Sequence, residues 1–472
     1  MILSKSLLRS TTIFCACAGV LLTVAAAQTI SVPNQTAPTS GSFQGSVPSG
    51  QATAQPVELS LDDAIQRGLR ANLGIILSGT QTTAARGQRL TELQSLLPAV
   101  DFKASETLMQ VDLPAQGLRI PGFPTVIGPF GYTDLRASLS WSIANVSSLR
   151  NYLAAKHNFT AATLSAQDAR DLVMLTVGNA YLLVLADESQ VGSVEAQVAT
   201  AKISLDQAAA SHSAGTAPRL DELRARVDYQ SLQQQLIAAR NAFEKDKLAL
   251  ARTIGLPLAQ SFTLTDKTPF SVFDQFDVNA AIQQAHANRK DIEAMVEQVK
   301  AAEEQRKAAT AERFPTLSVS ADYGIIGVNP GSSHGTVDAT GAIKVPLFKE
   351  FALRGDAQIA QSQLDLAKAQ LSDKGAQVDA DVRDALLDIQ SAQQQVEVAQ
   401  SSVELANEEL KEAQERYANG VSDNLSVSQA QQSVAQANDQ YVTSLYRHNV
   451  AKLSLARALG AGSSYKNYLG GK

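Results

Sequence analysis

Residues 382–425 read VRDALLDIQSAQQQVEVAQSSVELANEELKEAQERYANGVSDNL, and this stretch decides the fold. Apolar or small residues recur in it at alternating steps of three and four, and large side chains alternate with alanine. The series is Val382, Ala385, Ile389, Ala392, Val396, Ala399, Val403, Ala406, Leu410, Ala413 and Tyr417. This 3.5-residue period predicts a supercoiling helix packed along a neighbour, and the alanines let the two backbones approach closely.

Two further stretches carry the same period. After the turn at Gly420 the series is Val427, Ala430, Val434, Ala437, Tyr441, Ser444, His448, Ala451, Leu455 and Ala458, and an earlier one is Val177, Ala180, Val184, Asp187, Val191, Val194, Val198, Ala201, Leu205 and Ala208. No proline interrupts residues 130–217. A helix over about 150–214 would be roughly 100 Å long at 1.5 Å per residue. Helices this long cannot cover a compact core, so we expect a rod or the wall of a tube.

The chain repeats itself. LDDAIQ at 61–66 matches VNAAIQ at 278–283, and LPAV at 97–100 matches FPTL at 314–317, both 217 residues apart. Gly215 and Leu220 match Gly420 and Leu425, 205 residues apart. Ordered matches of this kind predict a duplicated unit. Each unit would hold a helix (about 61–96 and 278–313) that ends before a proline, two strands, and two long helices joined by a glycine turn.

Four segments of about ten residues alternate between apolar and polar side chains. Leu317, Val319, Ala321, Tyr323 and Ile325 share one face, as do Val337, Ala339, Gly341, Ile343 and Val345, and Leu135, Ala137, Leu139, Trp141 and Ile143; residues 100–111 follow the pattern less clearly. A half-buried sheet of a soluble domain has the same period of two. The remaining sequence, however, is long helix and leaves nothing to cover the apolar face. The pattern therefore favours membrane-barrel strands, which need about 9–11 residues to cross. Four strands cannot close a barrel, so protomers would have to share one.

The N-terminus predicts export. Lys5 and Arg9 precede an apolar stretch that ends in AAA at 25–27, which is typical of a cleaved signal peptide over 1–27. A retained membrane anchor and lipidation at Cys17 are the alternatives. Both cysteines, Cys15 and Cys17, lie in this segment, so a cleaved chain would have no thiol chemistry. Residues 28–56, rich in Pro, Ser, Thr and Gly, are expected to form a flexible leader.

The full pattern resembles the TolC family of outer-membrane efflux ducts. The likeness covers about residues 57–460 and rests on the duplication, on the order helix–strand–strand–helix–turn–helix, and on the turn RYANGVSDNL at 416–425. The first turn, HSAGTAPRL at 212–220, is similar but lacks the Arg-Tyr pair. The resemblance implies an α+β fold: a homotrimer with a shared 12-stranded transmembrane β-barrel and an α-barrel of long antiparallel coiled-coil helices. It also implies a periplasmic adaptor protein and an inner-membrane RND or ABC transporter as partners.

The resemblance assigns the two glycine turns, at Gly215 and Gly420, to the periplasmic tip, where the adaptor docks. Asp221 and Tyr417 would form a carboxylate–phenol hydrogen bond that closes the tip; the alternative is that Asp221 is an ordinary first-turn acid. Ser426 and Gln429 stand where relatives can carry a constricting aspartate ring, and Ser422 where they can carry a bridging arginine. Cation preference at the tip should therefore be weak. Asp423 either replaces part of the ring or caps a helix.

Composition and motifs indicate neither catalysis nor the binding of nucleic acid, metal or cofactor. The net charge of −6 comes with no basic stripe, which indicates no nucleic-acid partner. The five histidines are scattered, and nucleophile, phosphate-loop and metal-ligand motifs are missing, so neither an enzyme nor a cofactor is expected. His448 lies on a packing seam, where a core histidine is expected rather than a ligand, and Asp187 on the other seam has no assigned role.

We therefore predict an outer-membrane exit duct, extending into the periplasm, for drugs, metabolites or metal ions. A type I protein-secretion duct and a periplasmic coiled-coil adaptor remain alternatives, and a periplasmic hydrolase is a remote one. The predicted organisation is a signal peptide (1–27), a leader (28–56), two structural repeats (57–262 and 263–462) and a C-terminal tail (463–472).

Overall fold

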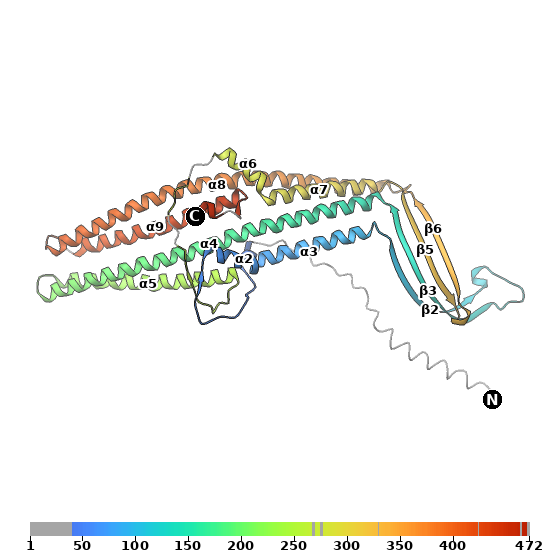
Figure 1. Cartoon of the computed structure of the whole chain (residues 1–472), viewed down its shortest axis with the longest axis horizontal. Coiled ribbons are helices and arrows are strands. Elements are labelled where there is room, and N and C mark those ends of the chain that lie inside the picture. Colours follow the sequence, from blue (N-terminus) through green and yellow to red (C-terminus); the bar gives the residue numbers. More distant parts are fainter. Residues whose placement is uncertain are drawn as a thin grey trace, which may run out of the picture. The chain divides into compact units, whose positions relative to one another are not determined.

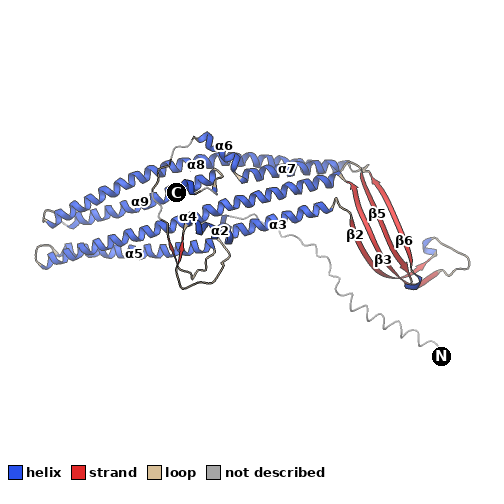
Figure 2. Cartoon of the chain, in the orientation of Figure 1, coloured by secondary structure: helices blue, strands red, loops and turns tan. Residues whose placement is uncertain are grey.

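The computed structural model describes residues 40–266, 270–273, 277–328, 330–422, 424–462 and 465–469. The signal-peptide and Cys17 predictions therefore lie outside the described residues. From residue 40 on, the chain forms long helices that lead at one end into a four-stranded sheet and at the other into two tight turns (Figures 1 and 2).

The two halves of the chain have the same order of elements. The first half contains β1 (Val57–Leu59), α2 (Leu61–Ala71), α3 (Leu73–Gln94), β2 (Ala99–Asp112), β3 (Val126–Ala144), α4 (Val146–Ser213) and α5 (Arg219–Ile254). The second contains β4 (Phe262–Leu264), α6 (Val278–Asn288), α7 (Lys290–Ala311), β5 (Thr316–Gly327), β6 (His334–Lys344), α8 (Glu350–Ala418), α9 (Asn424–Ala458) and the short α10 (Lys466–Leu469). The predicted duplication is thus visible as repeated architecture.

The boundary predicted between residues 262 and 263 falls inside β4. This strand pairs in parallel with β1, with Val57 opposite Phe262, so one small sheet joins the beginning and the end of the first half. The repeat boundaries themselves stay a prediction.

The first helix of each repeat is broken, which corrects the continuous helices expected over 61–96 and 278–313. Asn72 separates α2 from α3 with an extended backbone, at φ −65° and ψ 134°. Its fully buried side chain accepts a hydrogen bond from Gly74 N (2.9 Å) and donates to Phe43 O (2.6 Å). Arg289 makes the matching break between α6 and α7, where its guanidinium binds Asp291 and Asp381 at 2.7 Å. Both breaks depend on contacts distant in sequence, so helical periodicity gives no sign of them.

The heptad seams are buried as predicted. On α8 the buried side chains include Val382, Ala385, Ile389, Ala392, Val396, Ala399 and Ala406, and on α9 they include Val427, Ala430, Val434, Ala437, Ala451, Leu455 and Ala458. α8 lies along α9, and α4 lies along α5, α7 and α3. One window of α4 is long and apolar enough to cross a membrane, and 44% of that window is buried inside the protomer.

The expected flexible leader over 28–56 is corrected for its described part. Residues 40–56 lie against the helices: Phe43 is 7% exposed, Val47 N donates to Ala71 O at 2.9 Å, and Ser49 N donates to Gly255 O at 3.1 Å. In the tail, Tyr465 is buried and its hydroxyl donates to Asp62 at 3.1 Å. Backbone hydrogen bonds hold the first segment and a buried tyrosine holds the second, and composition reveals neither.

The four-stranded sheet has the order β2-β3-β5-β6, antiparallel throughout. Its register places Phe102, Ala137, Tyr323 and Val337 in one row across all four strands, on the face predicted to be apolar. This face is exposed: Phe102 is 73% and Val337 is 76% accessible in the protomer. The predicted alternation is confirmed, and the weakest of the four predictions, residues 100–111, is a strand.

Asp187 and His448, two polar residues of the predicted packing seams, lie among other polar groups between the helices. Burial, together with the neighbouring Asp246 carboxyl on α5, raises the pKa of Asp187 to about 7; its Oδ2 is buried without a hydrogen-bond partner among the described residues. His448 is fully buried, and its Nε2 lies 3.1 Å from Ser271 O. Lys452, one turn further along α9, donates to Ser271 Oγ at 2.6 Å, and burial lowers its pKa to about 8.

Candidate functional site

The turns that join α4 to α5 and α8 to α9 lie at the same end of the helices, opposite the sheet (Figure 1). Gly215 has φ 74° and Gly420 has φ 70°, the left-handed region that favours glycine. In both turns the amide after the glycine closes a six-residue loop: Thr216 N donates to Ser211 O and Val421 N to Arg416 O, each at 3.0 Å. This is the Schellman arrangement. Both glycines thus lie at the helix reversals with a backbone conformation that favours glycine, and their part in docking stays a prediction.

The first turn of α5 contains two acidic residues, one buried and one in ion pairs. Asp221 is 8% exposed, and Glu222 binds His212 Nδ1 at 2.9 Å and Arg226 at 2.7 Å. Two acids at a helix N-terminus are stabilised by its unpaired amides. The bridge from Glu222 to His212 also ties the start of α5 to the end of α4, across the turn.

The hydrogen bond expected between Asp221 and Tyr417 is not formed within the described part of one protomer. The Tyr417 hydroxyl is buried and has no hydrogen-bond partner there. Burial, and secondly the nearby Asp221 carboxylate, raise the pKa of Tyr417. The two groups are therefore neighbours, as the resemblance implied, but the phenol does not close the contact. A buried hydroxyl without a partner is unfavourable, so this group does not stabilise the contact between the hairpins within the described protomer.

The other predicted tip residues have distinct placements. Ser422 Oγ donates to Ser426 Oγ at 2.9 Å within the turn, Ser426 is half-buried, and Gln429 is exposed. Asp423 lies outside the described residues. A role for these positions in conduction stays a prediction.

Three polar side chains at the start of α9 hold the two helical hairpins together. Ser428 Oγ donates to Asp228 Oδ2 on α5 at 2.6 Å, and Gln431 Nε2 donates to Ser204 Oγ on α4 at 2.9 Å. Asn424, 3% exposed, donates to the backbone oxygen of Asp221 at 3.4 Å. We call Asn424, Ser428 and Gln431 the α9 latch.

Sequence reasoning missed the α9 latch, although a signal exists. The three residues follow one another at four and three positions, so they share one face of α9 beside the Val427–Ala430–Val434 seam. Polar residues beside a heptad seam are normally solvated. Only the position of α5 and α4 shows that this face meets another hairpin.

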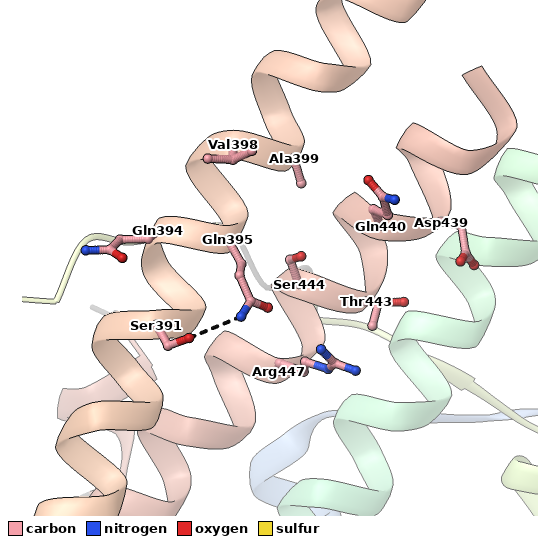
Figure 3. A pocket seen from close by; sticks show the side chains of 10 residues that line it. All are labelled: Ser391, Gln394, Gln395, Val398, Ala399, Asp439, Gln440, Thr443, Ser444 and Arg447. Carbon is pink, nitrogen blue, oxygen red and sulfur yellow. Dashed lines mark hydrogen bonds between the residues drawn. The ribbon is translucent and has the colours of Figure 1, made fainter. Parts of the chain in front are cut away.

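Two polar grooves run along the same helices above the tip. One, of about 420 Å³, lies between the hairpins and is lined from all four long helices, by residues such as Gln197, Leu232, Asn407 and Asn438. Another, of about 510 Å³, lies between α8 and α9 (Figure 3). Gln395 donates there to Ser391 at 3.1 Å.

The larger groove does not gather catalytic groups. Its two charged residues, Asp439 and Arg447, stand eight positions apart on α9 and are not paired with each other. Its other polar groups are uncharged amides and hydroxyls. Over the described part of the chain, no three His, Cys, Asp or Glu side chains lie close enough to hold a metal ion.

Long antiparallel helices lead into a sheet whose apolar face is exposed, which is the architecture expected of a membrane channel subunit. The chain belongs to the outer membrane efflux protein family, whose family model matches residues 80–256 and 281–461. The family and the fold are those of channel proteins rather than enzymes, located in the outer membrane with a periplasmic extension.

The chain is similar to the toluene efflux pump outer membrane protein TtgF and to the probable efflux pump outer membrane protein SepC, both of Pseudomonas putida. Each is 25% identical over 416 residues, covering 85% of this chain and 83% of the relative. Among solved structures, VceC of Vibrio cholerae has a TM-score of 0.73 at 20% identity, covering 85% of this chain and 96% of its own. CmeC of Campylobacter jejuni has a TM-score of 0.74 at 18% identity, covering 91% and 95%. These structures share the fold.

Proposed function

We propose that three copies of this chain form the exit duct of a tripartite efflux system. The sheets of three protomers close into one 12-stranded barrel, and the long helices form a tunnel below it. The observation that carries this proposal is the sheet itself, with an exposed apolar face and two edge strands, β2 and β6. Lipid accepts the apolar face but not an open edge, because backbone groups there find no water. Pairing β6 of one protomer with β2 of the next satisfies both requirements.

The tip is proposed as the docking and gating end. Apolar side chains are exposed on it: Leu220 is 54% and Val421 is 69% accessible. Such residues on both turns suit contact with a periplasmic adaptor protein, fed by an inner-membrane RND or ABC transporter. The α9 latch would hold the two hairpins of each protomer together in the closed state. Ser426, Gln429 and Asp423 would line the passage near it.

Small-molecule export is the proposed activity. The relatives are efflux pump components, one of them of a toluene pump, which supports small solutes over secreted proteins as cargo. The grooves lined by Gln, Asn, Ser and Thr suit a wetted wall that binds no solute tightly. The chemical identity of the cargo would follow from the pump.

Cross-linking across the strand edges tests the assembly. Both native cysteines precede residue 28, so a chain with Phe102→Cys on β2 and one cysteine on β6, placed in turn at Val337, Ala339, Gly341 or Ile343, carries a defined pair; several positions are needed because closing a barrel staggers neighbouring strands. In outer membranes, a short bis-maleimide should convert at least one of these chains into a covalent trimer on denaturing gels. The matched control, Ala137→Cys with Tyr323→Cys, joins facing positions of β3 and β5 and should stay monomeric. A protein that is extracted without detergent, or that cross-links only to dimers, would contradict the proposal.

A further inference from the structure

The polar face of the sheet carries its charges in adjacent rows of the strand register. Asp101, Ser138, Asp322 and Asp338 are Cα partners in one row across β2, β3, β5 and β6. The next row contains Lys103 and Arg136, and the row after it contains Asp134. We call the six charged residues of these rows the charged belt.

The belt has an excess of negative charge that its own ion pairs do not remove. Arg136 binds two carboxylates, Asp322 at 2.5 Å and Asp134 at 3.3 Å. Asp338 stands directly opposite Asp322, a like-charge arrangement that is unfavourable across strands. Its Oδ1 accepts a hydrogen bond from Thr340 at 3.1 Å, and within the described residues it makes no ion pair.

Four carboxylates against two cations leave two negative charges per protomer, hence six in a trimer. Lys344, the cation at the helical end of β6, lies six residues from Asp338, about 20 Å at ~3.3 Å per residue. That exceeds the Debye length of about 8 Å at physiological salt, so Lys344 does little to compensate. At the tip, by contrast, Ser422, Ser426 and Gln429 are uncharged.

The orientation of the sheet decides where this charge acts. The apolar row of Phe102, Ala137, Tyr323 and Val337 occupies the opposite face, so a sheet with that face in lipid turns the belt to the lumen. A ring of one sign inside a low-dielectric wall concentrates counter-ions and repels ions of like charge.

We propose that the charged belt is the charge-selective element of the duct and that it favours cationic over anionic solutes. This inference rests on the proposed function, because it needs the barrel to close with the polar face inward. The two negative charges in excess supply the attraction, and Asp338, which makes no ion pair among the described residues, is one of them. Arg136 limits it, by neutralising Asp322 and Asp134.

Ion selectivity in planar bilayers tests the belt. With the detergent-extracted wild-type protein under a KCl gradient, the reversal potential should give a K⁺/Cl⁻ permeability ratio above one. The double variant Asp322→Asn/Asp338→Asn removes both excess charges and should bring the ratio close to one. Arg136→Gln should raise it above the wild-type value. The opposite signs exclude a general loss of structure as the cause.

The matched control is Glu106→Gln. Glu106 is on β2 but on the apolar side, where it accepts a hydrogen bond from Thr133 at 2.5 Å, so removing its charge should leave the ratio unchanged. Wild-type permeability ratios in all belt variants, or an anion-selective wild type, would refute the selectivity proposal without affecting the proposal that the protein is an exit duct. A correctly inserted protein with no conductance in any form would instead overturn the duct, and the belt with it.

Discussion

Removal of the α9 latch should open the tip. The change is the triple variant Asn424→Ala, Ser428→Ala and Gln431→Ala, which deletes the three hydrogen bonds from α9 to the α4–α5 hairpin. None of the three side chains contributes to the apolar seam, so the coiled coil of α8 and α9 should persist. The expected result is a helix hairpin that stays folded but separates more readily from its neighbour.

The free energy lost in the triple variant can be estimated from the lengths and partners of the three hydrogen bonds. The bond from Ser428 to the Asp228 carboxylate, at 2.6 Å, involves a charged acceptor and is worth about 1.5–3 kcal/mol, and the neutral bond from Gln431, at 2.9 Å, about 1 kcal/mol. The bond from Asn424, at 3.4 Å, is at the long limit and adds little. Since Ser428 and Asp228 are only half-buried, about 2 kcal/mol per protomer is expected, which is a roughly 30-fold shift towards the separated state.

Single-channel recording in planar bilayers measures this shift as the fraction of time at full conductance. The control is Tyr417→Phe: its hydroxyl has no partner within the described protomer, so its removal should leave closure unchanged or slightly more stable. Closed times equal to wild type in the triple variant would refute the latch. A larger leak from Tyr417→Phe than from the triple variant would show that the Tyr417 hydroxyl, and not the latch, keeps the tip closed.

Two further predictions concern stability. Gly420→Ala forces a side chain into φ 70° and should destabilise the tip by about 1 kcal/mol, whereas Gly355→Ala, in the second turn of α8 with no atom near the added Cβ, should stabilise by about 0.5–1 kcal/mol; equal thermal midpoints for the two variants would contradict the argument. The pKa of Asp187 rises on folding from 3.8 to about 7, so its contribution to stability is complete below the lower value and is lost as the pH rises through 7. The melting midpoint of wild type, measured by circular dichroism, should therefore fall between about pH 4 and 7, level off above 7, and fall less in Asp187→Asn; parallel curves would exclude the raised pKa.

The helical part of the fold was predictable because its rules are local. A 3.5-residue period of large residues and alanine leaves one packing face on α8 and α9, and the left-handed glycines Gly215 and Gly420 end the helices in the same way. The breaks at Asn72 and Arg289 were not predictable. Asn72 is held by Phe43 and Arg289 by Asp381, both far away in sequence, so no window of the chain contains the cause.

The site was predictable in place but not in its contacts. The turn pattern located the tip, and the resemblance placed Asp221 beside Tyr417. The contact between the hairpins passes instead through the α9 latch, because the rotation of α9 about its axis brings Ser428 to Asp228, whereas the Tyr417 phenol on α8 has no donor or acceptor among the described residues. Helix rotation depends on packing against every neighbour, so the polar pattern of one helix does not define it.

From the sequence alone come the duplication, the long supercoiling helices, the two faces of each strand and the absence of charge at Ser426 and Gln429, since each follows from residue type and spacing along the chain. The tertiary structure decided which strands are neighbours, and therefore that Asp101, Asp322 and Asp338 form one row with Arg136 beside it. Register is set by loops and by pairing between segments nearly 200 residues apart. Charges that look scattered in the chain become a belt only when the strands are aligned.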